Sequence, residues 1–567
     1  MSHTVSPVGT RAVIVDLPDL ATVMAWHASL VASPLPGQVE AIAAARTVLV
    51  CFDAHSSAIA GLKALRDFRP QSSAETTPRE VTIDVIYDGE DLADVAELMG
   101  ISTEELIDRH TQQKWLAAFG GFAPGFTYCV PAEDDHSYTW DIARRSSPRT
   151  AVPAGAVGLA GQFSAVYPRT SPGGWQLLGH TTQPMWDTHA EQPALLQPGD
   201  TVRYRQVRES INVEAGVDTT SSDAHAGTLK DTSTSAGVGA SQSNKPHVPV
   251  RPSLKVLDAG LQTLFQDTGR AGYGDIGVNS SGAIDRASAW AANDVVGNSS
   301  TATVLENIGG LELEALVDTA VCVTGARAQV SIDRKTFELG APVQVKAGQT
   351  LKIEPVGGKG NGLRNYVAIR GGLITDQVLG SSATDILSGL GPQPVATGDV
   401  LKAGRRTAQA SVGTTTTNPF DGSNVLRCVA GPRANWFSDE ELQRFTEIEW
   451  IVTGQSNRVG LRLALPEGSE DSHGSEGSPT PTPLQRSRDG ELASEGMVTG
   501  SIQVPPNGLP VVFMADHPVT GGYPVIATVV DKDLDKAGQL APGDTVRFEL
   551  MEFDQQAQQS QQAPQPQ

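Results

Sequence analysis

The chain has 567 residues, too many for one ordinary core, and this length predicts about three or four domains. Its formal net charge of −22 excludes the basic surface that nucleic acids require and disfavours binding to anionic membranes. The four cysteines form no closely spaced pair, so neither a metal site nor a disulfide framework is expected. The N-terminus lacks the order of a signal peptide, and no apolar run reaches the length of a membrane span. We therefore expect a cytoplasmic protein.

Strand-like and helix-like runs alternate at the start of the chain, which predicts a small α/β domain over residues 1–90. The expected strands are 11–17, 47–53 and 80–88, and the expected helices are 19–32 and 57–68. Two further helices follow. Ser102 and Glu105 form a capping-box pattern that begins the second of these helices, and Gly100 is placed to end the first.

From about residue 118 the pattern changes to short β-like runs between Gly and Pro turns, which is typical of a barrel or sandwich. We expect a first barrel over 91–205 and a second β-barrel region over 251–551. Residues 206–250 are small and polar, a composition that predicts a disordered linker. The polar stretch 466–490 is expected to be a disordered insertion, and 552–567 a disordered tail.

A weak internal echo links the two β regions. SPGGWQLLG at 171–179 precedes PGDTVRY at 198–204, and VTGGYPVIA at 519–527 precedes PGDTVRF at 542–548. Common turn chemistry explains either motif alone. Their shared order favours two barrels of one architecture.

The first half carries an ordered set of Gly- and Pro-rich motifs. They read GGFAPGFTY at 120–128, SPR at 147–149, VPAGAVGLAG at 152–161, YP at 167–168 and SPGGW at 171–175. In this order they resemble the family of allophanate hydrolase subunit 1, which includes the B-type component of 5-oxoprolinase. The resemblance covers roughly residues 10–205.

The second half carries a different set. It includes QDTGRAGY at 266–273, SSGAID at 280–285, RGG at 370–372, SNRVG at 456–460, GSIQVP at 500–505 and TGGYP at 520–524. These motifs resemble the family of allophanate hydrolase subunit 2, which includes the C-type component of 5-oxoprolinase and is related to the carboxyltransferase region of urea amidolyase. One departure is GSSAT at 380–384, where the family usually has an arginine.

The resemblance implies a mainly β fold in which a small α/β domain precedes cyclophilin-like β-barrels. It implies a component of an ATP-dependent 5-oxoprolinase, which hydrolyses 5-oxo-L-proline to L-glutamate together with a separate A-type component of that enzyme. ATP, with Mg, is the expected cofactor, although the chain has no P-loop and no biotin attachment site. Two alternatives stay open: a regulatory binder of a histidine kinase, and a carboxyltransferase that acts on urea or a similar small amide with a biotin protein.

Opening a lactam with ATP calls for cations that bind phosphate and for carboxylates that handle protons. Arg270, Arg370 and Arg458 are the candidate cations, because each lies beside glycine in a motif. The candidate catalytic carboxylates are Asp267, Asp285 and Glu306. Structural roles compete with catalysis here: Asp267 pairs with the nearby Arg270, Asp285 caps the following helix, or Glu306 satisfies a buried turn.

The remaining candidates for substrate or nucleotide binding lie in the motif loops of both halves. They are Phe122, Pro124, Gly125, Phe126, Arg149, Gly173, Gly174, Trp175, Tyr273, Asn457, Gln503, Gly521, Gly522 and Tyr523. Three histidines, His180, His189 and His517, are expected to be surface or packing residues. The central hypothesis is that the two motif-rich modules form a composite cleft for a small amide or lactam.

Overall fold

The computed structural model describes residues 3–71, 79–132, 135, 138–145, 147–208, 250–404, 423–466, 482–490 and 492–553. The predicted linker and tail therefore lie almost wholly outside the described residues, and of the predicted insertion 466–490 only residues 466 and 482–490 are described. The structure is mainly β with an α/β N-terminal part, so the predicted fold class is confirmed. No helix among these residues has the length and apolar character needed to cross a membrane.

The N-terminal unit is a four-stranded antiparallel sheet of order β1-β2-β4-β3, with two helices on one face. Its elements are β1 (Thr4–Val8), β2 (Ala12–Asp16), α1 (Leu20–Ala32), β3 (Gln38–Ala43), β4 (Thr47–Phe52) and α2 (His55–Asp67). Side chains alternate between the faces of each strand. Val13 and Val15 pack with the helices, whereas Ala12 and Ile14 face a second cluster that contains Val519. The sheet is thus buried on both faces.

The second unit is a seven-stranded sheet of order β12-β9-β10-β7-β6-β13-β5. A bridge between Ile86 and His180 joins its two edges. The strands are β5 (Glu80–Val85), β6 (Trp115–Gly120), β7 (Thr127–Pro131), β9 (Ala156–Ala160), β10 (Phe163–Val166), β12 (Gln176–His180) and β13 (Thr201–Gln206), and the pair β8 (Arg149–Val152) and β11 (Ser171–Gly173) lies beside them. We call this unit barrel 1.

Helices α3 (Leu92–Met99) and α4 (Thr103–Gln112) connect β5 to β6. Ser102 accepts a hydrogen bond from the backbone of Glu105, and Gly100 ends α3 in the left-handed conformation, as predicted. One boundary was wrong. The strand expected at 80–88 as part of domain 1–90 is β5, and it pairs in parallel with β13 of barrel 1. Its local sequence predicts a strand but carries no information about a partner so far along the chain.

The third unit packs two sheets on one core. The seven-stranded sheet contains β20 (Lys335–Phe337), β19 (Ala328–Ile332), β22 (Thr350–Pro355), β17 (Leu311–Ala315), β14 (Val250–Asp258), β25 (Val400–Gly404) and β24 (Leu373–Ile374). The five-stranded sheet contains β15 (Gln262–Gln266), β16 (Val304–Ile308), β23 (Asn365–Ile369), β18 (Thr319–Gly325) and β21 (Val343–Val345). The loop after β15 includes a 3₁₀ turn, η1 (Gly274–Ile276), and leads into α5 (Arg286–Val295). We call this unit the sandwich.

The fourth unit is a closed barrel of order β26-β33-β30-β31-β28-β27-β34, which we call barrel 2. Its strands are β26 (Val425–Ala430), β27 (Trp450–Val452), β28 (Gly460–Ala464), β30 (Ser501–Gln503), β31 (Val511–Phe513), β33 (Val525–Val529) and β34 (Thr545–Met551). Additional elements are η2 (Ala434–Trp436), α6 (Asp439–Glu447), η3 (Asp531–Asp533), α7 (Leu534–Gln539) and the pair β29 (Glu495–Gly496) and β32 (Thr520–Gly521).

The two barrels share one strand order, which agrees with the internal echo. The strand that begins within each PGDTVR motif, β13 or β34, pairs in parallel with the first strand of its barrel and antiparallel with the strand after the helix. Equivalent side chains also match. Trp115 and Trp450 each donate Nε1–H to the backbone oxygen five residues earlier, at 3.1 Å.

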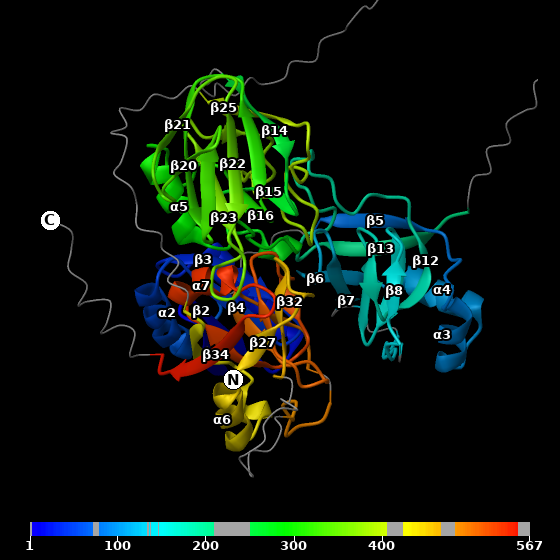
Figure 1. Ribbon diagram of the computed structural model, residues 1–567. Coiled ribbons are helices and arrows are strands. Elements are labelled where there is room, and N and C mark those ends of the chain that lie inside the picture. Colours follow the sequence, from blue (N-terminus) through cyan, green and yellow to red (C-terminus); the bar gives the residue numbers. More distant parts are fainter. Residues whose placement is uncertain are drawn as a thin grey trace, which may run out of the picture.

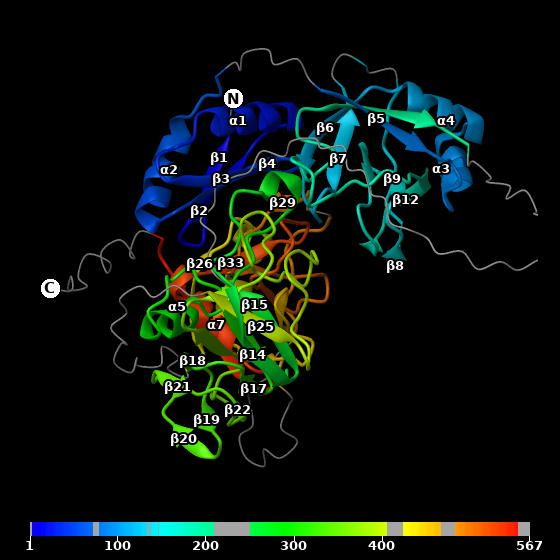
Figure 2. The same ribbon diagram turned by 90° about the horizontal axis from the view of Figure 1, so that it is seen from above.

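The order of units in space differs from their order in the chain. The N-terminal unit lies against barrel 2 through one cluster of its core and shares another cluster with barrel 1, which extends to one side (Figures 1 and 2). The sandwich packs on barrel 2 from another direction (Figure 1). Barrel 2 is thus the centre of the molecule, with three units around it.

The core of barrel 2 gives a test of this arrangement. Trp450 is completely buried, so Trp450→Ala leaves a cavity and should lower the free energy of unfolding by about 3–5 kcal/mol. The control is Trp290→Ala on α5, where the side chain is 44% exposed and little change is expected. Urea unfolding followed by circular dichroism measures both. Equal losses in the two variants would contradict the barrel core described above.

Candidate functional site

Residues 267–285, which we call the junction segment, connect β15 to α5 and touch three other units. The backbone N–H of Gly274 donates to Oε2 of Glu40 on β3, at 3.2 Å. Asp275 accepts from His27 Nε2 on α1, at 2.8 Å. The backbone oxygen of Ile276 accepts from Gly125 in barrel 1, at 2.9 Å. The segment therefore fixes the N-terminal sheet and barrel 1 relative to the sandwich.

A buried ion network holds the other end of the junction segment. Arg458, in the loop between β27 and β28, donates to Glu306 at 2.6 Å and binds Asp516 through two nitrogens, at 2.8 and 2.9 Å. The same guanidinium donates to the backbone oxygen of Gly282, and Ser281 donates to Asp516. The structure thus brings two predicted residues, Glu306 and Arg458, into direct contact.

These charges are fully buried and fully paired. Burial acts to raise the pKa of Glu306, but Arg458 and Arg364 outweigh it and hold that pKa below its usual value. Arg458 is 1% exposed. The network is therefore a closed connection between the sandwich and barrel 2, and Glu306 stays charged in it because two arginines lie beside it.

The other two predicted carboxylates also lie in hydrogen-bond networks. Asp285 caps α5 by accepting from Ser288, at 2.9 Å to the backbone and 2.6 Å to the hydroxyl, and also accepts from Gln539. Burial raises the pKa of Asp285. Asp267 accepts from Ser381 at 2.6 Å and from the backbone of Ser382 at 2.7 Å, so it binds the GSSAT loop.

Arg270 lies near this loop but makes few bonds. It is 2% exposed and donates one bond to the backbone oxygen of Ala383. Its Nε and Nη1 have no hydrogen-bond partner within the described residues. Burial lowers the pKa of Arg270, and the nearest carboxylates, beginning with Asp385, only partly offset this.

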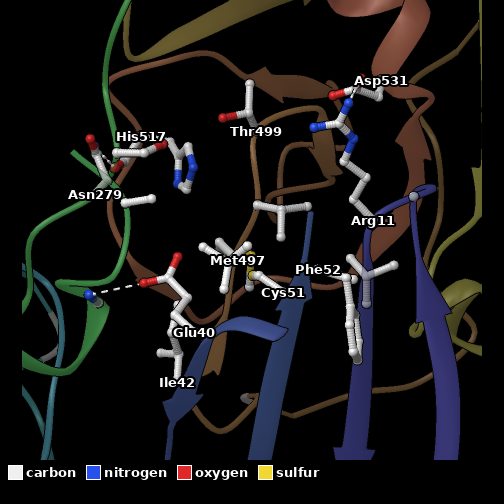
Figure 3. Close-up of a pocket in the computed structure, with 18 of the residues that line it drawn as sticks. Arg11, Glu40, Ile42, Cys51, Phe52, Asn279, Met497, Thr499, His517 and Asp531 are labelled. Carbon is white, nitrogen blue, oxygen red and sulfur yellow. Dashed lines mark hydrogen bonds and ion pairs between the residues drawn. The ribbon is translucent and has the colours of Figure 1, made fainter. Parts of the chain in front are cut away.

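A cavity of about 330 Å³ opens where the N-terminal sheet meets the junction segment and barrel 2 (Figure 3). The sheet contributes the turn between β1 and β2 together with Glu40, Ile42 and Cys51. The remaining wall comes from the second half of the chain, including Thr268, Asn279, Met497, Thr499, His517 and Asp531. Both halves of the chain are needed to enclose this volume.

The polar groups of the cavity fall into two regions (Figure 3). On one side Glu40 faces His517 and Asn279, and burial raises the pKa of Glu40 while it lowers that of His517. On the other side Arg11 pairs with Asp531 at 2.9 Å, and Arg286 binds the same carboxylate at 2.8 Å. In this view Met497 and Cys51 lie between the two regions (Figure 3).

The predicted aromatic residues of the first half form a cluster inside barrel 1. Phe126 packs edge to face on Phe122, at 5.2 Å, and on Trp175, at 5.6 Å. Pro124 and Gly125 belong to the same loop as Phe122, and Gly173 and Gly174 precede Trp175. Arg149 binds Asp91 at 2.8 Å and Glu90 at 3.0 Å.

The predicted residues of the second half are scattered. Tyr273 precedes η1, Arg370 follows β23, and Asn457 accepts from the backbone of its own loop. Gln503 donates a hydrogen bond to the backbone oxygen of Tyr523. Tyr523 is 44% exposed, and the guanidinium of Arg486 lies over its ring. Gly521 and Gly522 directly precede Tyr523 in the chain. None of the predicted site residues is among the residues that line the cavity.

Sequence reasoning missed Glu40, Asn279 and His517. Asn279 directly precedes the SSGAID motif and His517 lies three residues before the TGGYP motif, so proximity to motifs was an available signal for these two. Glu40 belongs to a strand that was not predicted and lies outside every motif.

Comparison with known proteins follows the same division into halves. The model of the carboxyltransferase domain, subdomain C and D, matches residues 3–196, and that of subdomain A and B matches residues 276–550. The C-type component of 5-oxoprolinase from Escherichia coli (strain K12) is 32% identical over 304 residues, which cover 52% of this chain and 90% of that protein. The chain belongs to the carboxyltransferase-domain family that includes the B-type and C-type components of 5-oxoprolinase.

Further relatives extend this assignment. The B-type component of 5-oxoprolinase from Escherichia coli O157:H7 is 34% identical over 213 residues, which cover 36% of this chain and 96% of that protein. The crystal structure of TTHA0988 superposes with a TM-score of 0.75 at 29% identity and covers 95% of this chain and 99% of that one. The urea amidolyase of Saccharomyces cerevisiae is 30% identical over 319 residues, 53% of this chain but 17% of that protein. The predicted resemblance to a fusion of the B-type and C-type components is confirmed, and we name residues 3–208 the B half and residues 250–553 the C half.

The buried network of the C half can be tested directly. Arg458→Met removes the buried guanidinium that binds both Glu306 and Asp516, so we expect the free energy of unfolding to fall by about 3–5 kcal/mol. Arg462→Met is the matched control, since Arg462 is exposed on the neighbouring strand β28. The measurement is the urea midpoint of each variant by circular dichroism. A shift for Arg458→Met no larger than the control's would show that the network contributes little.

Proposed function

We propose that this chain is the fused B-type and C-type component of an ATP-dependent amide hydrolase, which converts 5-oxo-L-proline to L-glutamate together with a separate A-type component. The observation that carries the proposal is the cavity, because its walls come from both halves. Relatives of these halves are the separate B-type and C-type components of 5-oxoprolinase. Fusion keeps the two walls on one chain, so the cavity does not depend on two proteins meeting.

The size and polarity of the cavity support a small amide as its ligand. Its volume of about 330 Å³ lies at the lower end of the range of about 300–1,000 Å³ that ligand sites occupy. A five-membered lactam with one carboxylate is a ligand of this size. Glu40, Asn279 and His517 offer hydrogen-bonding groups on one side for the amide of such a ligand.

The cavity does not fit the triphosphate of ATP. Its lining includes the carboxylates of Glu40, Asp53 and Asp531, and both of its arginines already bind Asp531. Even with Glu40 protonated, the two arginines of the lining are matched by Asp53 and Asp531, so a polyanion placed there would meet no excess of positive charge. We therefore place only the amide substrate in the cavity, and we propose that ATP with Mg is held outside it, at a site to which the A-type component contributes.

The predicted carboxylates and arginines have a positioning role in this proposal. Glu306, Arg458 and Asp285 hold the junction segment, whose outer surface forms one wall of the cavity. Asp267 and Arg270 fix the start of the same segment against the GSSAT loop. Substitution of these residues is expected to change the shape of the cavity through the segment.

Reconstitution tests the proposed reaction. The purified chain mixed with the A-type component of 5-oxoprolinase, ATP, Mg and 5-oxo-L-proline should release glutamate and ADP in equal amounts, because one ATP activates each lactam. This chain alone and the A-type component alone are the controls, and each should show little turnover. No glutamate from the mixture, in a preparation where the A-type component is active with its own B-type and C-type partners, would contradict the proposal.

Carboxyl transfer is the second candidate, and the likeness to urea amidolyase favours it. In that case the cavity would hold urea or a similar small amide, and a biotin protein would supply the carboxyl group. The same purified chain distinguishes the two reactions. Copurification of a biotinylated protein, with carboxylation of urea and no glutamate from 5-oxoproline, would support carboxyl transfer.

A further inference from the structure

We propose that His517 and Glu40 bind the amide edge of a small lactam inside the cavity. In this arrangement Nε2 of His517 accepts the lactam N–H, and the Glu40 carboxyl donates to the lactam carbonyl oxygen. The inference rests on the proposed function, which supplies the substrate class. It assigns one contact to each half of the chain, because Glu40 belongs to the B half and His517 to the C half.

The hydrogen bond of His517 determines which ring nitrogen is available. Nδ1 lies 2.8 Å from the backbone oxygen of Pro518, and a carbonyl oxygen can only accept, so Nδ1 carries the proton. Burial lowers the pKa of His517, which keeps the ring neutral and leaves a lone pair on Nε2. No hydrogen bond to Nε2 is present within the described residues. Stacking on Phe513, with 5.6 Å between ring centroids, fixes the ring.

Glu40 offers the complementary group. Its Oε2 accepts the backbone N–H of Gly274, and its carboxyl points toward the ring of His517 across the cavity (Figure 3). Burial raises the pKa of Glu40, and the charge of Asp275 raises it further. The protonated form is therefore favoured up to a higher pH than usual, and a protonated carboxyl donates one hydrogen bond while it still accepts another.

These two groups match an amide better than an anion. A lactam holds its amide in the cis form, so its N–H and its carbonyl oxygen lie side by side on one edge. That edge presents one donor and one acceptor, which is the complement of Nε2 and the protonated carboxyl. Asn279 adds a further acceptor, because its side-chain oxygen is buried without a hydrogen-bond partner within the described residues. A phosphate or carboxylate would bring only acceptors to this wall.

Binding of a lactam to the whole chain tests the assignment without requiring turnover. The probes are 5-oxo-L-proline and 2-pyrrolidinone, measured by isothermal titration calorimetry. His517→Phe keeps an aromatic ring for stacking but removes the acceptor, and we expect it to weaken binding about tenfold. Glu40→Ala should weaken binding by a similar factor. Glu40→Gln should recover most of that loss relative to Glu40→Ala, because its amide also donates.

A matched control separates this effect from general perturbation. His189→Phe makes the same exchange at an exposed position and should bind both probes as the unsubstituted chain does. The thermal midpoint of each variant shows whether it is folded. The contrast between Glu40→Gln and Glu40→Ala gives a second, independent reading if His517→Phe is unstable.

The outcomes distinguish this inference from the proposed function. Loss of binding in His517→Phe and Glu40→Ala, without glutamate release in reconstitution, would support the lactam site and contradict the reaction. Glutamate release with unchanged binding in both variants would support the reaction and overturn the site. Absence of binding to the unsubstituted chain would also overturn the site.

Discussion

The contact between the sandwich and barrel 2 is centred on the buried cation Arg458. Arg458 is surrounded by Glu306 from the sandwich and Asp516 from barrel 2, and a charge at this depth is stable only when its partners are in place. Because Glu306 belongs to the sandwich and Arg458 to barrel 2, the two units cannot separate without breaking this ion pair and exposing its charges. The same guanidinium binds the backbone of Gly282, so the relative position of the two units also fixes the junction segment.

The junction segment transmits this constraint to the first half of the chain. Its middle part accepts one hydrogen bond from α1 and donates one to β3, and it meets the GFAPG loop of barrel 1. A further ion cluster, in which Arg433 of barrel 2 binds Asp16 of the N-terminal sheet and Glu495, holds the opposite side of the interface. The cavity lies beside the junction segment, and its lining includes both Glu40 and the Arg11–Asp531 ion pair. Its shape is therefore set by contacts between the halves more than by either half alone.

Local chemistry was sufficient to predict much of the fold. The Ser102 cap and the Gly100 terminus follow from side-chain and backbone geometry within a few residues, and the structure confirms both. The repeated PGDTVR motifs predicted two barrels of one architecture, which β13 and β34 confirm by their identical pairing. The residues after Asp285 also predicted that it caps a helix, as the structural alternative to a catalytic role. The structure confirms that Asp285 caps α5.

Contacts over long sequence distances could not be predicted. Arg458 and Glu306 are 152 residues apart, and no local pattern links them. Two further features also join residues that are far apart in the sequence: β5 pairs with β13, and Glu40 lines the same cavity as His517. Each depends on how whole units pack. The motifs themselves were informative about family, yet their most prominent side chains fill the aromatic core of barrel 1 or close the network around Arg458. The polar lining of the cavity comes from neighbours of the motifs and from a strand outside them.

A crystal structure of the full chain grown with 5-oxo-L-proline gives the most direct measurement of the central claim, that the site is built jointly by the two halves. The account predicts density for the lactam between the N-terminal sheet and barrel 2, in contact with residues of both the B half and the C half. Density for the ligand in a site formed by one half alone, with this cavity empty, would contradict it.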